Sequence, residues 1–424
     1  MELSKLNSLV ELFFKKSHQI QSRSDKPFLR WLKDNKKGFL SWKEVTQNIQ
    51  ILSEYLKNNL SKGDRCVLLS ENRPEWLIID LAVMNAGGVT VPLFTTYAEK
   101  DYEYILNDCK PKICIVSNNT QLNKIKKFVS NEIKVLSIEN ISDKIESVEN
   151  ILEKNNSKSE LDFNKNIERK NLACIIYTSG TTGNPKGVVY HHRGSYLMAT
   201  GSAVAWNMPN KLNFLYTVPM FHCNGWCYPW TMSMIHGRVI CLRNIDVKKI
   251  FELIDKYEVT HFGGAPIVLN MITGAPESDK KKLKQKVYVL TAGAPPPSII
   301  FKKMRALGFE VMHVYGLTET YGHVTQCAWN DEWNNFDEEK QNEIKARQGV
   351  RYPNTEGVVV LDPETMKEVP KDGKTIGEIM IRGNVVMKGY FKDKDATDKA
   401  MKDGWFHSGD LAVMHSDGYV KIQD

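Results

Sequence analysis

The sequence of 424 residues contains no long uninterrupted apolar run. A helix that crosses a bilayer needs about 18 such residues or more, so no membrane span is predicted. The N-terminal stretch Met1–Leu6 carries an acid at Glu2 and lacks an apolar region that ends in small residues, which argues against a secretory signal. We therefore expect a cytoplasmic protein.

Closely spaced cysteines are also scarce. The eight cysteines are scattered, and Cys66, Cys114 and Cys174 lie in apolar stretches typical of buried, reduced thiols. Cys223 and Cys227 are the one close pair, but their spacing is not Cys-x-x-Cys and no second pair follows. A zinc site is therefore not predicted.

Neither the charge nor the length points to a nucleic-acid-binding module. The formal charge of +7 comes from a lysine-rich surface without interleaved aromatic residues, and no recognition motif accompanies it. Its densest run, Lys280–Lys286, is predicted to be a solvated helix face.

A hydrophobic content of 42% and a charged content of 25% are typical of a soluble globular enzyme. The length predicts two or three domains.

Strands and helices alternate through the first part of the chain. Ser41 and Glu44 form a capping box that opens a helix running to about Leu56. The alternation predicts a parallel, doubly wound sheet, and residues 140–170 are expected to be a surface connection. The predicted strands are Cys66–Ser70, Val89–Leu93 and Ile113–Ser117, and the predicted helices are Glu75–Ala86 and Asp101–Asn107.

A second α/β run follows, in which three strands end in turns that contain glycine. These strands begin at Thr260, Val287 and Glu310. Ligands of open α/β sheets bind outside the carboxyl ends of the strands, where such turns lie. Beyond about residue 335 the strands become short and alternating, which predicts a smaller β-barrel-like part. We therefore expect an α/β fold in three parts, comprising residues 1–170, 171–335 and 336–424.

The stretch Tyr177–Gly187 has the composition of a phosphate-binding loop. Apolar residues enter and leave it, and it holds three glycines, four hydroxyl side chains besides Tyr177, one lysine and no acid. Glycines let backbone N–H groups converge on an anion, hydroxyls donate to phosphate oxygens, and Lys186 adds a positive charge. It is not the common phosphate loop of NTPases, because Pro185 precedes the lysine and Gly187 follows it. The alternative is a flexible hairpin tip.

Four further segments offer groups that an ATP site uses, although each has an ordinary structural explanation. They are Pro219–Trp226, Gly293–Pro297, Tyr315–Glu319 and Gly404–Asp410. The first holds a histidine among aromatics, which alone is more typical of a core group. The second is a rigid turn, the third is typical of a helix start, and the fourth places an Asp in a turn. Together with the loop they supply a phosphate cradle, a metal carboxylate, a stacking ring and a diol acceptor.

These segments, in this order, resemble the adenylate-forming (AMP-binding) superfamily of acyl-CoA synthetases, peptide-synthetase adenylation domains and luciferases. The resemblance extends from Ser41 to Asp424. Within the superfamily the chain is most similar to fatty-acid and related acyl-CoA ligases. The segments that carry this finer likeness are Pro219–Trp226, Gln348–Gly349 and Gly383–Tyr390.

The resemblance implies roles for individual residues at the nucleotide. The loop that holds the β- and γ-phosphates of ATP corresponds to Thr178, Ser179, Gly180, Thr181, Thr182, Gly183 and Lys186. Thr178 and Glu319 match the positions near Mg²⁺, and Thr318 matches the one that reaches the α-phosphate. The nucleoside is expected at Gly293, Ala294, Tyr315, Gly316 and Asp410, with Tyr315 stacking on adenine and Asp410 holding the ribose.

The resemblance also implies the acyl site and the reaction. His222 corresponds to the histidine beside the acyl carboxylate, and Trp226 to a position that gates the fatty-acid tunnel of long-chain relatives. Lys186, His222, Thr318 and Glu319 are the expected catalytic residues. The implied partners are ATP with Mg²⁺, a carboxylic acid (a fatty acid first) and coenzyme A, in a cytoplasmic enzyme that can form a homodimer. No Gly-x-Ser-x-Gly elbow is present, which argues against a covalent acyl-enzyme of the hydrolase type.

In the family, Asp424 matches a hinge that is followed by a small C-terminal lid with a catalytic lysine. This chain of 424 residues is therefore expected to bind ATP and an acyl substrate but to adenylate poorly. The alternatives are adenylation of a short-chain, aromatic or amino acid carboxylate, and a catalytically silent nucleotide-binding module. An amino acid is disfavoured because no Asp lies between Pro219 and Trp230 to meet its ammonium group.

Overall fold

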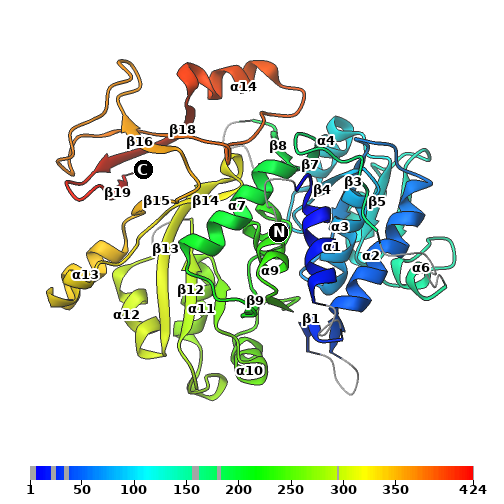
Figure 1. Cartoon of the computed structure of the whole chain (residues 1–424), viewed down its shortest axis with the longest axis horizontal. Helices are drawn as coiled ribbons and strands as arrows, with labels where there is room; N and C mark the ends of the chain where they lie inside the picture. The colour runs from blue at the N-terminus through cyan, green and yellow to red at the C-terminus, as the bar shows by residue number, and fades with distance from the viewer. Residues whose placement is uncertain are drawn as a thin grey trace.

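The structure of the chain is a computed structural model that describes residues 6–20, 25–32, 38–154, 162–178, 183–293 and 296–423. Two large α/β parts stand side by side, and a smaller β-rich part lies across one end of the second (Figure 1). Within the described residues, no helix combines the length and the apolar content that crossing a bilayer requires.

The first α/β part is built on a six-stranded sheet in the order β6-β5-β3-β4-β7-β8, parallel except for the antiparallel pair β7–β8. Its strands are β3 (Arg65–Leu69), β4 (Val89–Pro92), β5 (Ile113–Val116), β6 (Lys134–Ser137), β7 (Leu172–Tyr177) and β8 (Gly187–His191). Its helices are α2 (Trp42–Lys57), α3 (Pro74–Asn85), α4 (Glu99–Cys109), α5 (Asn119–Ile125) and α6 (Val148–Lys154).

Local sequence explains how two of these helices form. The predicted capping box of α2 is confirmed, because Ser41 Oγ accepts from Glu44 N and Glu44 Oε2 accepts from Ser41 N. Helix α3 is apolar on all sides and almost wholly buried, as expected of a helix that is covered all round. It packs between α2, the sheet and the second α/β part.

The second α/β part is built on a nine-stranded sheet in the order β15-β14-β13-β12-β11-β9-β10-β1-β2. Its strands are β1 (Pro27–Trp31), β2 (Phe39–Ser41), β9 (Asn213–Tyr216), β10 (Arg238–Cys241), β11 (His261–Gly263), β12 (Val287–Thr291), β13 (Phe309–Leu317), β14 (Gly322–Gln326) and β15 (Val350–Arg351). The six strands from β1 to β13 in this order run parallel, and β2, β14 and β15 are antiparallel to their neighbours.

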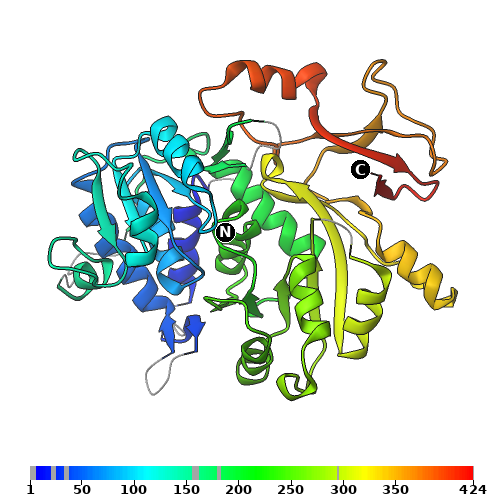
Figure 2. The same cartoon turned by 180° about the vertical axis from the view of Figure 1, so that it is seen from behind.

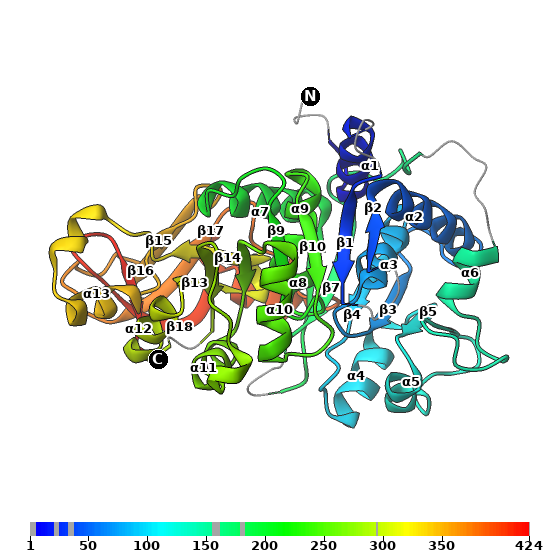
Figure 3. The same cartoon turned by 90° about the horizontal axis from the view of Figure 1, so that it is seen from below.

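Helices cover this sheet and join it to the first part. They are α1 (Leu9–Gln19), α7 (His192–Ala205), α8 (Cys223–Trp226), α9 (Tyr228–Met234), α10 (Val247–Tyr257), α11 (Pro266–Gly274) and α12 (Ser298–Ala306). Helix α1 packs against α9, and β1 lies beside β10, so the N-terminal segment crosses to the second sheet (Figure 3). The sheets therefore do not follow chain order, and the three-part division by residue number stays a prediction.

The third part is a four-stranded antiparallel sheet in the order β16-β17-β18-β19, which lies over the end of the second part where β13 and β14 turn (Figure 2). Its strands are β16 (Gly357–Leu361), β17 (Gly377–Arg382), β18 (Phe406–Met414) and β19 (Val420–Ile422), with α13 (Glu338–Lys345) and α14 (Lys394–Ala400) alongside. Among the described residues, the short 3-10 helices are η3 (Glu277–Asp279), η4 (Thr318–Thr320), η5 (Asp331–Asn335) and η6 (Lys402–Gly404).

The predicted fold class is confirmed, but two local predictions are wrong. The lysine run 280–286 is irregular rather than helical. Leu283 is its only apolar residue, so a helix there would have no face to pack, and packing supplies most helix stability. Residues 140–170, predicted to be a plain connection, contain α6, which buries Val148 and Ile151.

Candidate active site

The expected phosphate loop is the connection of a β-hairpin. Strands β7 and β8 pair antiparallel from Leu172 to His191, and Thr178 N donates to Lys186 O at 3.0 Å. This confirms the strand–loop–strand arrangement. Ser179, Gly180, Thr181 and Thr182 lie outside the described residues. Gly183 and Lys186 are exposed, and Lys186 Nζ stands 5.0 Å from the centre of the Tyr390 ring.

Tyr390 connects this hairpin to Glu319. The Tyr390 hydroxyl donates to Glu319 Oε1 at 2.9 Å, and Tyr390 forms a β-bridge with Val188 of strand β8. Burial raises the pKa of Glu319, while the hydrogen bond from Tyr390 and the charge of Lys186 oppose that rise. Sequence reasoning gave Tyr390 no role, although it ends the Gly383–Tyr390 stretch that supported the resemblance.

Two of the residues expected at the nucleoside, Tyr315 and Asp410, are in contact at the carboxyl end of the second sheet. The Tyr315 hydroxyl, near the end of β13, donates to Asp410 Oδ2 at 2.6 Å. Burial raises the pKa of the Asp410 carboxyl, and this hydrogen bond opposes the rise. Gly293 follows β12 with a φ of +95°, a conformation that favours glycine; Ala294 lies outside the described residues.

Gly316 is required by packing. A Cβ at this position would stand 1.8 Å from the carbonyl oxygen of Gly322 on the neighbouring strand β14. The bulge between Tyr315 and Gly316 in the β13–β14 ladder brings the two strands this close. The close approach of Gly322 therefore explains the glycine at position 316 without any ligand. The expected nucleotide-binding role of Gly316 stays a prediction.

Thr318 and His222 meet through Cys223. Cys223 Sγ lies 3.4 Å from Thr318 Oγ1 and 3.9 Å from His222 Nδ1. Burial would raise the pKa of the Cys223 thiol, but the neighbouring His222 and the Thr318 hydroxyl hold it below its ordinary value. The charge of Cys223 in turn raises the pKa of His222 against the effect of burial. The His222 ring packs edge-on against Phe94, which follows β4 of the other α/β part.

Trp226 is buried, with 6% of its surface exposed. A Cβ on Gly263 of β11 would lie 2.8 Å from Cζ3 of the indole, and the His323 ring of β14 lies edge-on at 4.4 Å between ring centres. The indole therefore occupies the space between β11 and β14.

Asn72 is a further residue that sequence reasoning missed, and it contacts the segment that leads to His222. It lies in the turn after β3, yet its amide Nδ2 donates to Tyr216 O at 3.3 Å and Val218 O at 2.9 Å. Its Oδ1 accepts from Met220 N at 2.7 Å. No sequence signal could have found these contacts, because they join segments about 145 residues apart.

The side chains fit a nucleotide-bound Mg²⁺ better than a metal held by protein alone. Within the described residues, no three or more His, Cys, Asp and Glu side chains cluster as a metal site. Mg²⁺ at a nucleotide needs only one or two protein oxygens beside phosphate oxygens. Glu319 and the Thr178 hydroxyl are of the right chemistry, and Lys186 lies close enough to Glu319 to lower its pKa.

Comparison with known proteins identifies the family. The family model described as AMP-binding enzyme matches residues 16–391. The chain belongs to this family. The acetate/butyrate–CoA ligase of Arabidopsis thaliana, named as peroxisomal, is 53% identical over 253 residues, which are 59% of this AMP-binding chain and 44% of that protein. The match thus spans less than half of that relative's length.

Two further comparisons cover nearly the whole chain. The probable acyl-activating enzyme 21 of Arabidopsis thaliana is 39% identical over 399 residues, which are 91% of this chain and 71% of that protein. The inhibitor-bound N-terminal domain of FACL13 from Mycobacterium tuberculosis superimposes with a TM-score of 0.84 at 23% identity, covering 99% of this chain and 100% of that one. The latter likeness shows the fold.

Proposed function

We propose that this AMP-binding chain is the ATP- and carboxylate-binding part of an AMP-forming acid–CoA ligase that activates a short carboxylate. The observation that carries the reaction class is the convergence of the hairpin lysine, Tyr390, Glu319, Thr318 and His222 in one continuous set of contacts. Such a set offers charge and hydrogen bonds to two anions, which is what the transfer of an adenylyl group to a carboxylate requires.

The proposed reaction has two steps. In the first, a carboxylate oxygen bonds to the α-phosphorus of ATP as the bond to pyrophosphate breaks. In the second, the sulfur of coenzyme A bonds to the acyl carbon, AMP leaves and the thiol proton is released. The protein contributes by holding both anions in line and by offsetting the charge that develops on phosphorus.

Each described residue has a proposed part in this task. Lys186 would hold the β- and γ-phosphates, Thr318 would donate to the α-phosphate, and Asp410 would accept from the ribose hydroxyls. Glu319 and Thr178 would hold Mg²⁺, which supplies charge neutralisation at the phosphates when bound. His222 would donate to the carboxylate of the acid.

Trp226 supports a short acyl group. The indole lies against Gly263 and His323, and we propose that it closes the space between β11 and β14 to a longer acyl chain. The acetate/butyrate–CoA ligase relative agrees with this size. A fatty acid, which the sequence resemblance put first, stays an untested alternative.

A panel of carboxylates from C2 to C18 and benzoate tests this proposal, with pyrophosphate release as the readout. It is measured for the chain and for its fusion to the C-terminal segment of the Arabidopsis acyl-activating enzyme, and ATP binding is measured by calorimetry. We expect the highest kcat/KM between acetate and butyrate. Highest activity with C12 to C18 acids would establish the fatty-acid alternative instead, and a chain that does not bind ATP would overturn the proposal.

Trp226→Ala is the matching substitution. Removing the indole is expected to raise kcat/KM for hexanoate relative to butyrate by about tenfold or more, because each buried methylene contributes a factor of about 10–200 in discrimination. Trp333→Ala, which removes a buried tryptophan from a cluster beside α13, serves as the control and should leave the chain-length profile unchanged. An unchanged profile in Trp226→Ala would show that another wall sets acyl length.

Location and assembly stay predictions. A cytoplasmic protein that forms a homodimer is expected from the sequence, although the acetate/butyrate relative is named as peroxisomal.

A further inference from the structure

The turn that carries His222 and Trp226 has a main chain that L-amino acids avoid. Five consecutive residues, Cys223 to Cys227, have φ between +39° and +63°, and only Gly225 among them is a glycine. Gly225 N donates to His222 O and Cys227 N to Asn224 O, so the segment is one turn of left-handed helix. Such a conformation persists only where the surrounding structure holds it.

Contacts from both α/β parts hold this turn. From the second part, the Tyr216 hydroxyl donates to Gly225 O at 2.9 Å. From the first part, Cys174 Sγ of β7 accepts from Asn224 Nδ2 at 3.0 Å. These two hydrogen bonds hold the turn itself. The direction in which the chain enters the turn depends on the preceding segment, residues 216–222.

Asn72 fixes that preceding segment. It binds the main chain at Tyr216, Val218 and Met220, which are alternate residues on the way from β9 into the turn. All its polar groups are used in these contacts, and 6% of its surface is exposed. A single side chain of the first part therefore sets the path of the strand end that delivers His222.

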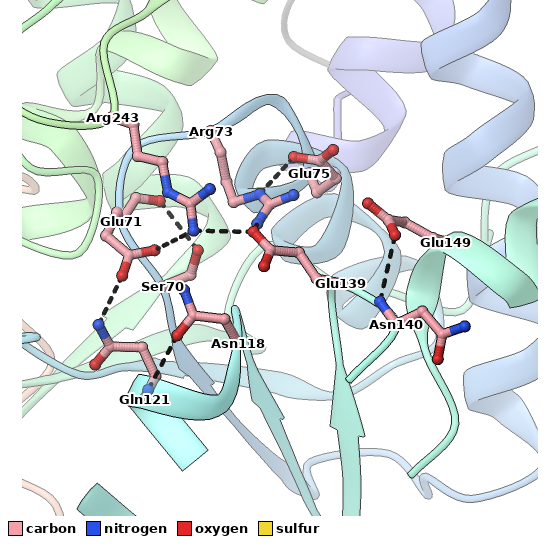
Figure 4. Close-up of polar contacts among 10 residues, drawn as sticks. All are labelled: Ser70, Glu71, Arg73, Glu75, Asn118, Gln121, Glu139, Asn140, Glu149 and Arg243. Atoms are coloured by element: carbon pink, nitrogen blue, oxygen red, sulfur yellow. Dashed lines mark hydrogen bonds and ion pairs between the residues drawn. The ribbon is translucent and has the colours of Figure 1, made fainter. Parts of the chain in front are cut away.

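The two chain neighbours of Asn72, Glu71 and Arg73, are anchored by hydrogen bonds and ion pairs (Figure 4). Glu71 accepts from Gln121 Nε2 at 2.6 Å and faces Arg243 at 3.6 Å. Arg73 pairs with Glu75 at 2.7 Å and with Glu139 at 2.8 Å. Because Glu71 and Arg73 are both anchored, the side-chain amide of Asn72 has little freedom to move with residues 216–220, which it binds.

We propose that Asn72 is a positioning residue for the acyl site, which aligns the left-handed turn so that Trp226 and His222 define the pocket for the acid. This inference rests on the proposed function, since it assigns the turn to acyl binding. Asn72 lies outside the nucleotide contacts, so its loss should affect the acyl group far more than ATP.

The test compares Asn72→Ala with Asn85→Ala. Asn85 is a matched control, because it is also a buried asparagine of the first part whose side chain makes hydrogen bonds: Asn85 Nδ2 donates to Ser53 Oγ, and Asn85 Oδ1 accepts from Asn164 N. Affinities for ATP and for the propyl ester of AMP, a stable stand-in for the acyl-adenylate, are measured by calorimetry on the 424-residue chain. Amide hydrogen exchange is followed in peptides covering residues 216–227.

For Asn72→Ala we expect ester affinity to fall about tenfold relative to ATP affinity, as loss of two or three hydrogen bonds allows, with faster exchange in residues 216–227. Asn85→Ala should change neither. Equal losses of affinity for ATP and for the ester, or unchanged hydrogen exchange in residues 216–227, would overturn the inference.

Asn72→Ser, which keeps a hydroxyl donor and acceptor, should give an intermediate loss of ester affinity and provides the second variant if the alanine variant does not fold. If the unsubstituted chain binds neither ATP nor ester, the proposed function fails, and the exchange comparison alone decides whether Asn72 holds the turn.

Discussion

At the scale of single residues, the candidate site depends on very few charges. Lys186 is exposed at the hairpin, while Glu319 is largely buried and shares a hydrogen bond with Tyr390. A buried carboxylate with a raised pKa is unfavourable to the fold unless a cation or hydrogen-bond donors compensate for it. Glu319 therefore has the character expected of a functional group.

Glu319→Gln tests the proposed Mg²⁺ role. Glutamine keeps an oxygen for the Tyr390 hydroxyl but removes the charge, so the Mg²⁺ concentration at which ATP binds half-maximally is expected to rise about tenfold, as one lost charge contact of about 1.4 kcal/mol implies. Calorimetric titration of ATP at several Mg²⁺ concentrations measures this. Glu103→Gln, at an exposed position of α4, is the control. Identical Mg²⁺ dependence in Glu319→Gln and the unsubstituted chain would remove Glu319 from the metal site.

At the scale of elements, periodic segments could be predicted from sequence and long-range ones could not. The bounds of α3, β4 and β5 agree with prediction to within one residue, because each is an apolar segment bordered by turn residues. The joining of β1 and β2 to the second sheet depends on pairing with residues about 210 positions away, which no local pattern specifies. The left-handed turn at 223–227 contradicts the local preference of its two cysteines and its tryptophan, and contacts from Tyr216 and Cys174 hold it instead.

Helix α3 is joined to α9 by a buried carboxyl group. Asp80 Oδ2 accepts from Trp230 Nε1 at 3.3 Å, and Asp80 Oδ1 has no hydrogen-bond partner. Burial raises the pKa of Asp80 to about 7. The contribution of Asp80 to the free energy of unfolding is therefore complete below the pKa that its carboxyl has in the unfolded chain. It is lost as the pH rises through about 7, because between these two pKa values the carboxyl ionises in the unfolded chain but stays protonated in the folded one.

Asp80→Asn should remove this pH dependence. Relative to the unsubstituted chain, the variant is expected to gain about 2–3 kcal/mol of unfolding free energy between about pH 5 and pH 8. Urea denaturation at several pH values measures the difference, and Asp143→Asn, at an exposed turn, is the control. A difference that is constant across this range would show that Asp80 has the same pKa in both states.

At the scale of the whole molecule, a charged network joins the two α/β parts (Figure 4). Arg243 follows β10 of the second sheet and pairs with Glu139, which follows β6 of the first, at 2.9 Å. Glu139 also pairs with Arg73, whose side chain is only 10% exposed. The same network involves both chain neighbours of Asn72, so the residues that flank Asn72 also connect the two parts.

Glu139→Gln removes the charge that both arginines share, and it leaves Arg73 buried with Glu75 alone. Since Glu139 is 34% exposed, solvent screens part of the effect, and we expect a loss of about 0.5–1.5 kcal/mol of unfolding free energy. The loss should shrink as salt rises from about 0.05 to 1 M, because the Debye length falls to about 3 Å. Glu338→Gln, which breaks the exposed pair with Lys302, should cost less than about 0.5 kcal/mol and serves as the control. If Arg243→Gln and Glu139→Gln gave additive losses in the double variant, the two parts would be held together by their apolar contacts instead, since coupled charges are not additive.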